Sequence, residues 1–238
     1  MIRLLSIFAA LLCAAPAGAA GVASLTWDGC TGPVTRTVLP GSQAVLFASV
    51  IGHSAFHAAY QVDLELSEDC AGNPPSFPDA WRFDTGRCQP SGALHYDYLP
   101  PAEMAATCPP FRPPVVDALL DNYYYDAITG RATLKVASIY FDGVPSADPA
   151  QRYFLARIVF DQGRGIVGPS VPGFCGGLET PLCIRPVYLT YLDLAGNAVS
   201  WETDTPCLTV NDPAQTSGCN LPTASRATTW GAIRGQYR

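Results

Sequence analysis

The sequence has few charged residues and almost no lysine. Charged side chains make up 14% of the 238 residues, and Lys135 is the only lysine among 14 basic residues. Because the arginines form no cluster, the sequence disfavours nucleic-acid binding, which depends on many phosphate contacts. The sequence also has no internal repeat and no helical period of useful length before residue 226, which disfavours an all-α or repeat architecture.

Long apolar runs are absent, apart from one near the N-terminus. Arg3 precedes the uncharged stretch Leu4–Ala15, and Ala17–Ala19 is a small-residue motif of the kind that signal peptidase cleaves. The run is too short for a transmembrane helix, which needs about 20 apolar residues. Cys13 follows a leucine rather than the small residue that a lipoprotein signal requires. The sequence therefore predicts a signal peptide at 1–19, a secreted or cell-surface location and no transmembrane segment.

Proline and glycine are abundant, with 22 and 21 residues, in a composition that is 48% hydrophobic. This mixture is typical of short strands joined by turns. Without Arg3 the chain would hold 13 basic and 20 acidic residues, a net charge of −7. We expect one acidic all-β domain over residues 20–222.

Eight cysteines follow the predicted signal peptide. They are Cys30, Cys70, Cys88, Cys108, Cys175, Cys183, Cys207 and Cys219. An even number in an exported chain predicts up to four disulfides, whereas zinc would need C-x-x-C spacing that these residues lack. The pairs Cys175–Cys183 and Cys207–Cys219 are favoured because each closes a short loop. The other four cysteines can pair in three ways, of which Cys30–Cys70 with Cys88–Cys108 is one.

Strict alternation identifies Tyr60–Leu66 as a strand with one face in the core and one in water. Tyr60, Val62, Leu64 and Leu66 share the apolar face, and Gln61, Asp63 and Glu65 are expected to form an ordinary solvated row.

Tyr153–Phe160 is apolar on nearly both faces, as in a strand flanked on both sides within a sheet. Asn122–Asp126 and Arg131–Phe141 read as a hairpin, and Val187–Asp193 and Ala198–Glu202 flank a turn with Gly196 and Asn197. We therefore expect an antiparallel β-sandwich, immunoglobulin-like or cohesin-like, stapled by disulfides.

Residues 223–238 differ from the rest of the chain and read as a linker and a short C-terminal helical tail. Trp230, Ile233 and Tyr237 stand at helical spacing, although two glycines weaken the helix. The tail either docks on the sandwich or serves as an attachment segment.

The motif closest to a catalytic one is Gly52-His53-Ser54-Ala55-Phe56, which resembles a nucleophile elbow. That elbow needs a small residue at its last position and a following helix, whereas Phe56 and an early strand stand here. Ser54 is therefore interpreted as a loop residue. We predict no catalysis; a secreted hydrolase or metal-dependent enzyme is the weaker alternative.

Metal binding has two weak candidates. His53 and His57 are four residues apart, with His95, Asp97 or Glu103 as a third ligand, but a helix between the two histidines is doubtful. Calcium could use loop carboxylates, either Asp121, Asp126 and Asp142 or Asp193 and Asp204, yet no EF-hand pattern is present. No metal and no cofactor is predicted.

Aromatic residues raise the possibility of carbohydrate binding. Tyr123, Tyr124 and Tyr125 are consecutive, so a strand would place two of them on one face and one on the other. Trp27, Trp81 and Trp201 are expected to fill the core, as tryptophans in sandwiches do.

Several segments together resemble a group of uncharacterised exported proteins from environmental bacteria. They are Leu25–Cys30, Ala59–Val62, Asp79–Phe83, Arg152–Leu155, the loop from Cys175 to Cys183 and the ending Thr228–Arg238. This resemblance implies secretion and a disulfide-bearing β domain but no activity. The strand content is also similar to cohesin-like sandwiches. We expect a non-catalytic binding or extracellular structural protein whose partner is a protein or a glycan at the cell surface, with a carbohydrate-binding module as the alternative.

Overall fold

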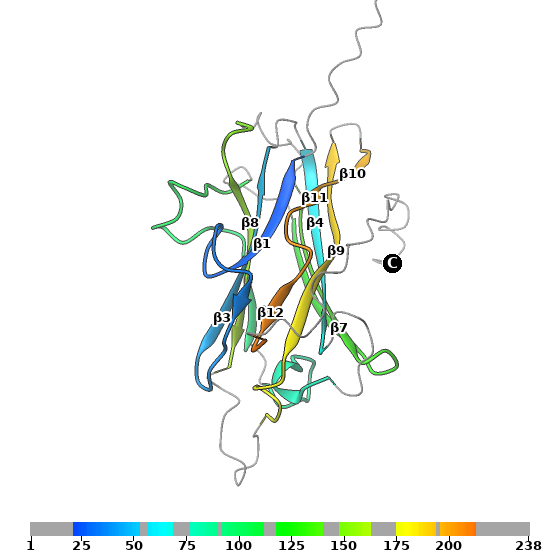
Figure 1. Cartoon of the computed structure of the whole chain (residues 1–238). Helices are drawn as coiled ribbons and strands as arrows, with labels where there is room; N and C mark the ends of the chain where they lie inside the picture. The colour runs from blue at the N-terminus through cyan, green and yellow to red at the C-terminus, as the bar shows by residue number, and fades with distance from the viewer. Residues whose placement is uncertain are drawn as a thin grey trace, which may run out of the picture.

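The chain folds into two facing β-sheets (Figure 1). The computed structural model describes residues 21–52, 57–68, 77–89, 92–111, 118–139, 148–162, 175–193 and 196–212. The predicted signal peptide and the predicted C-terminal helical tail lie outside these ranges. Within them there is no α-helix, only one 3-10 turn, and no helix is long and apolar enough to cross a membrane.

The first sheet has the strand order β11-β1-β3-β8-β5. Its strands are β1 (Val22–Trp27), β3 (Gln43–Ile51), β5 (Leu94–Asp97), β8 (Tyr153–Asp161) and β11 (Glu202–Thr203). Neighbouring strands within this sheet run antiparallel, except that β1 and β11 run parallel. As its two apolar faces predict, β8 has a partner strand on each side.

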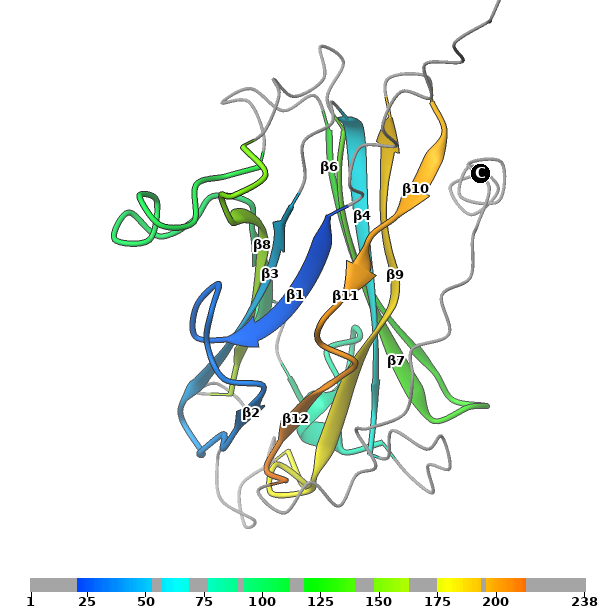
Figure 2. The same cartoon turned by 45° about the horizontal axis from the view of Figure 1, so that its top comes forward.

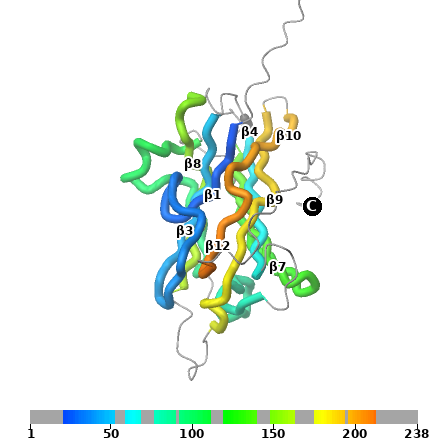
Figure 3. The backbone as a smooth tube through the Cα atoms, in the orientation of Figure 1, coloured from blue at the N-terminus to red at the C-terminus, as the bar shows by residue number. Residues whose placement is uncertain are grey.

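The second sheet has the order β2-β12-β9-β4-β7-β6, and β10 pairs with β9 beside this path. Its strands are β2 (Thr35–Arg36), β4 (His57–Ser67), β6 (Ala118–Asp126), β7 (Arg131–Ile139), β9 (Leu182–Asp193), β10 (Ala198–Ser200) and β12 (Leu208–Val210). Figures 2 and 3 show β1, β3 and β8 in one layer and β4, β7 and β9 in the other.

The core lies between the sheets and is formed by alternate residues of their strands. In β4, Tyr60, Val62, Leu64 and Leu66 are at most 2% exposed, which confirms the predicted inward face. Full burial of such side chains stabilises the fold by about 1.5–3 kcal/mol each. The tryptophans predicted to fill the core do so: Trp27, Trp81 and Trp201 are at most 4% exposed.

The two aromatic residues of Trp81–Phe83 alternate with Arg82, which predicts a small strand, but the structure has no strand there. Asp79–Trp81 is a 3-10 turn, and the carbonyl oxygen of Ala80 accepts hydrogen bonds from Gln89 Nε2 at 2.8 Å and Gln162 Nε2 at 3.0 Å. Gln162 lies 82 residues from Ala80 in sequence, so no local pattern signals its hold on the turn.

Three of the predicted disulfide pairs are wrong. Cys30 bonds Cys108 and Cys88 bonds Cys175, with Cα–Cα distances of 6.5 and 5.4 Å. Cys175–Cys183 was predicted from its short loop, and Cys30–Cys70 with Cys88–Cys108 was one of three pairings left open, whereas the fold brings together cysteines 78 and 87 residues apart. Cys183 and Cys207 are also disulfide-bonded. Cys70 and Cys219, with the predicted Cys207–Cys219 pair, lie outside the described residues.

Candidate functional site

The hairpin of β6 and β7 presents a mixed aromatic and aliphatic surface. Tyr123 and Tyr125 point inward, where Tyr123 Oη donates a 2.8 Å hydrogen bond to the Trp81 carbonyl and the Tyr125 ring lies 3.5 Å below the Arg82 guanidinium. Tyr124 points outward and is 60% exposed. Two of the three consecutive tyrosines thus share one face, as predicted.

The turn that joins β6 and β7 is held by Asp126. Its Oδ1 accepts a hydrogen bond from the Ile128 amide at 2.8 Å, and its Oδ2 accepts one from Thr129 Oγ1 at 2.9 Å. Both hydrogen bonds lower the pKa of Asp126, and the bond from the Ile128 amide has the larger effect. Gly130 has φ of 65°, a left-handed conformation that favours glycine. The fixed turn leaves Ile128 95% exposed and projects from the sandwich (Figure 1).

Four exposed large hydrophobic residues belong to this hairpin. We call Leu119, Leu120, Tyr124 and Ile128, which are 43%, 38%, 60% and 95% exposed, the hairpin patch. Within the described residues only three other large hydrophobic side chains are this exposed, and they are scattered. The alternation of β6 places Leu120 and Tyr124 on one side of the strand and Leu119 on the other. Exposed apolar groups that share one surface mark interaction sites, whereas single ones are ordinary. Sequence analysis missed the patch because Leu119 and Leu120 lie in a short apolar run without a clear period.

The outward row of β4 is not solvated, which corrects the sequence expectation. Gln61 and Asp63 are 7% and 2% exposed although they face away from the core. Asp63 Oδ1 accepts a 2.8 Å hydrogen bond from Gln61, and Lys135 Nζ lies 3.7 Å from Asp63 Oδ2. Burial raises the pKa of Asp63, and these two neighbours oppose the rise. Glu65 is bound by Arg131 at 3.2 Å and Arg185 at 2.6 Å.

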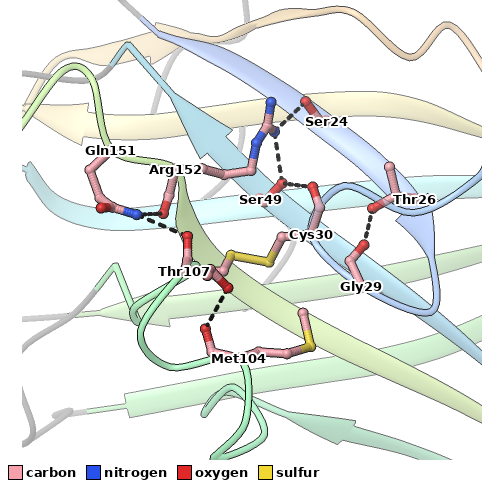
Figure 4. The surroundings of a disulfide bond; sticks show 10 residues. Ser24, Thr26, Gly29, Cys30, Ser49, Met104, Thr107, Gln151 and Arg152 are labelled. Atoms are coloured by element: carbon pink, nitrogen blue, oxygen red, sulfur yellow. Dashed lines mark hydrogen bonds between the residues drawn. A yellow bond between two sulfur atoms is a disulfide. The ribbon is translucent and has the colours of Figure 1, made fainter.

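The outer face of the first sheet is covered by two loops that the Cys30–Cys108 disulfide joins (Figure 4). The cysteines pack with Phe47 and Phe154, and Met104 lies against this cluster. The start of β8 is also held by one of these loops, because the Phe154 amide donates a 2.8 Å hydrogen bond to the Pro109 carbonyl. This face is therefore occupied by the chain's own loops.

Beside the disulfide, a polar network links three strands. Arg152 Nη1 donates hydrogen bonds to Ser24 Oγ at 2.7 Å and Ser49 Oγ at 3.1 Å (Figure 4). Ser24 Oγ in turn donates to Asp204 Oδ2 at 2.8 Å. Ser24 and Ser49 are at most 3% exposed, so the network ties β1 and β3 to Arg152, the residue directly before β8.

The predicted histidine and serine candidates do not form a described site. His53 and Ser54 lie outside the described residues, and the side chain of His57 is not described. His57 belongs to β4 in one sheet, whereas His95 is exposed on β5 in the other. Asp97 is engaged by Arg157 Nε at 2.9 Å. The fold thus separates His57 from His95 and pairs Asp97 elsewhere.

Three of the carboxylates considered for calcium, those of Asp126, Asp193 and Asp204, serve local structure. Asp193 Oδ1 accepts a 2.7 Å hydrogen bond from the Asn197 amide, which confirms the predicted turn around Gly196. Asp204 binds Ser24, Asp126 holds its own turn and Asp142 lies outside the described ranges. Within the part of the chain that the structure describes, no group of three or more His, Cys, Asp or Glu side chains could hold a metal ion.

No family model and no curated protein matches the sequence. Among solved structures, cohesin modules are similar in fold. The sixth cohesin of scaffoldin B from Acetivibrio cellulolyticus, solved with a mutant Cel5 dockerin, has 14% identity and a TM-score of 0.39 over 80% of this chain and 97% of its own. The second type II cohesin of the ScaA scaffoldin has 10% identity and a TM-score of 0.41, with coverage of 80% and 96%.

A non-cellulosomal cohesin from the archaeon Archaeoglobus fulgidus has 12% identity and a TM-score of 0.34, covering 79% of this chain and 89% of its own. All three likenesses concern the arrangement of strands and not the sequence. The pairing of strands in this chain is by itself sufficient to define a two-sheet sandwich.

Proposed function

We propose that this chain is an exported, non-catalytic module that binds a protein partner through the hairpin patch. The observation that carries the proposal is that four of the seven exposed large hydrophobic residues in the described part of the chain belong to β6 and its turn: Leu119, Leu120, Tyr124 and Ile128. Tyrosine buries a large area and is enriched among the residues that dominate binding energy, which suits Tyr124 to the centre of a protein interface.

The rigidity of the hairpin supports the same proposal. Tyr123 and Tyr125 fasten β6 to the core side, and Asp126 fixes the turn, so the patch is held in place before binding. A preorganised surface loses less conformational entropy on association. The disulfide bonds support the exported location, because disulfides persist in oxidising compartments.

Charge selects the kind of partner. Asp121 and Asp126 belong to the same strand as the patch, and the chain is acidic overall. We therefore expect a protein that presents apolar side chains within a basic rim, since complementary charge steers association and excludes wrong partners. A glycan platform would need several exposed aromatic rings, and Tyr124 is the one aromatic side chain of the hairpin patch.

Site-specific photo-crosslinking tests the proposal. A photoreactive phenylalanine replaces Tyr124 or Ile128, and the control replaces Leu39, which is 62% exposed but lies outside the hairpin. In the native host we expect a discrete protein adduct from positions 124 and 128 and none from 39. Equal adducts from all three positions, or no adduct from any, would refute the proposal.

A further inference from the structure

The only lysine of the chain lies opposite a buried carboxylate. Lys135 on β7 is paired with Asp63 on β4, and both side chains face away from the core that Val62 and Val136 enter. Asp63 is 2% exposed, the side chain of Lys135 is 24% exposed, and Lys135 Nζ lies 3.7 Å from Asp63 Oδ2. The fold therefore holds a primary amine against a carboxyl group that is almost completely removed from water.

The choice of lysine at this position is informative, because 13 of the 14 basic residues are arginines. Arginine binds a carboxylate through two parallel hydrogen bonds, and its guanidinium keeps its proton. Lysine differs because its amine can lose a proton and act as a nucleophile. The other ion pairs between described residues all use arginine: Arg36 with Asp28, Arg82 and Arg87 with Asp84, Arg157 with Asp97, and Arg131 and Arg185 with Glu65.

The surroundings favour the uncharged forms of the two groups. Burial raises the pKa of Asp63, although its hydrogen bond from Gln61 and the charge of Lys135 oppose the rise. Transfer of one proton from the Lys135 ammonium to the Asp63 carboxylate removes both charges, and surroundings poor in water favour that exchange. The product of the transfer is a nucleophilic amine beside a protonated carboxyl group.

We propose that Lys135 and Asp63 become joined by an amide bond between their side chains, which crosslinks β7 to β4. Lys135 Nζ attacks Asp63 Cγ, the Nζ–Cγ bond forms and the Cγ–Oδ2 bond breaks. Oδ2 leaves as water with the carboxyl proton and one proton from the amine, so no oxidant, reductant or further reactant is consumed.

Gln61 is placed to assist this reaction. Its Nε2 donates a 2.8 Å hydrogen bond to Asp63 Oδ1, the oxygen that remains as the amide oxygen. Negative charge develops on this oxygen while the tetrahedral intermediate forms, and a donor already in place stabilises that charge. Gln61 is 7% exposed, so bulk water does not compete for the bond.

The two reacting groups need only a short approach. The neighbouring strands and Gln61 fix Asp63, whereas the four-carbon stem of Lys135 is flexible and can bring Nζ within the roughly 3–3.5 Å of Cγ that reaction requires. Such a fixed arrangement corresponds to an effective concentration on the order of 10⁵ M or more. Glu65, the next carboxylate on this face of β4, is bound by two arginines and does not compete for the amine.

The mass of the purified full chain tests the proposal. The protein is reduced and alkylated, its N-terminus is determined, and its intact mass is compared with the mass that the sequence requires. We expect the wild-type chain to be lighter than this by one water molecule, and Lys135→Arg and Asp63→Ala each to have the full mass. Lys135→Arg is the matched control, because it keeps the positive charge but leaves the Asp63 carboxyl free.

Proteolysis of the same samples locates the bond. In the wild-type chain we expect a branched peptide that joins Lys135 to Asp63, no tryptic cleavage after Lys135, and no acetylation of its amine after unfolding. The full mass in the wild-type chain would overturn the proposal and leave an ordinary buried ion pair. A loss of water without the branched peptide, as from dehydration of another residue, would overturn it equally.

Discussion

Removal of the Cys30–Cys108 disulfide should destabilise the sandwich strongly. The bond closes a loop of 78 residues between the first strand and the cover of the outer face. In the chain-entropy model, a loop of this length restricts the unfolded state by about 4.5 kcal/mol at 25 °C. Cys30→Ala with Cys108→Ala should therefore lower the free energy of unfolding by about 4 kcal/mol, with an additional loss from the cavity that the sulfurs leave.

Urea unfolding under non-reducing conditions measures this loss, with tryptophan fluorescence as the signal. Each single alanine variant should lose nearly as much as the double variant, because either change breaks the same bond. Single losses that add up in the double variant would show that Cys30 and Cys108 have different partners. A loss below about 1 kcal/mol would refute the entropic reasoning.

Three further changes test the core, the buried carboxylate and a turn. Leu134→Ala removes a fully buried side chain and should cost about 2–5 kcal/mol in urea unfolding. Burial raises the pKa of Asp63, so the folded chain binds the carboxyl proton more tightly than the unfolded chain does. The free energy of unfolding therefore falls as pH rises from the ordinary carboxyl pKa through the raised one. In the Lys135→Arg background, where the carboxyl stays free, Asp63→Asn lacks this fall, so its stability relative to Lys135→Arg alone should increase with pH over that interval; a constant difference would contradict the assignment. Asp193→Ala removes the acceptor for the Asn197 amide, so hydrogen exchange at that amide should accelerate while global stability falls by no more than about 1 kcal/mol.

Local patterns were sufficient to predict most of the strands. Period two defines the faces of β4 without any tertiary information, and β8 spans Tyr153–Asp161, close to the predicted apolar strand Tyr153–Phe160. The turn at Gly196 and Asn197 was predictable because glycine and asparagine accept positive φ. These features depend on residues that are neighbours in sequence.

Features that depend on distant segments were not predictable. The alternation in β4 shows that Asp63 faces away from the core, but it cannot show that this face is itself buried. The disulfide partners of Cys30 and Cys88 depend on which loops the fold brings together. Ile128 is apolar and 95% exposed at a turn, and only the structure shows that Tyr124, Leu119 and Leu120 of the adjoining strand are exposed as well.

Calorimetric titration of the partner identified by crosslinking tests the central claim most directly. Leu120→Ser with Tyr124→Ala should weaken binding by at least tenfold, because truncation of a central anchor typically costs 2 kcal/mol or more. The matched variant Leu39→Ser with Leu99→Ser removes two hydrophobic side chains that are 62% and 57% exposed outside the hairpin patch and should bind as the wild type does. Equal affinity for all three proteins would contradict the assignment of the hairpin patch as the binding surface.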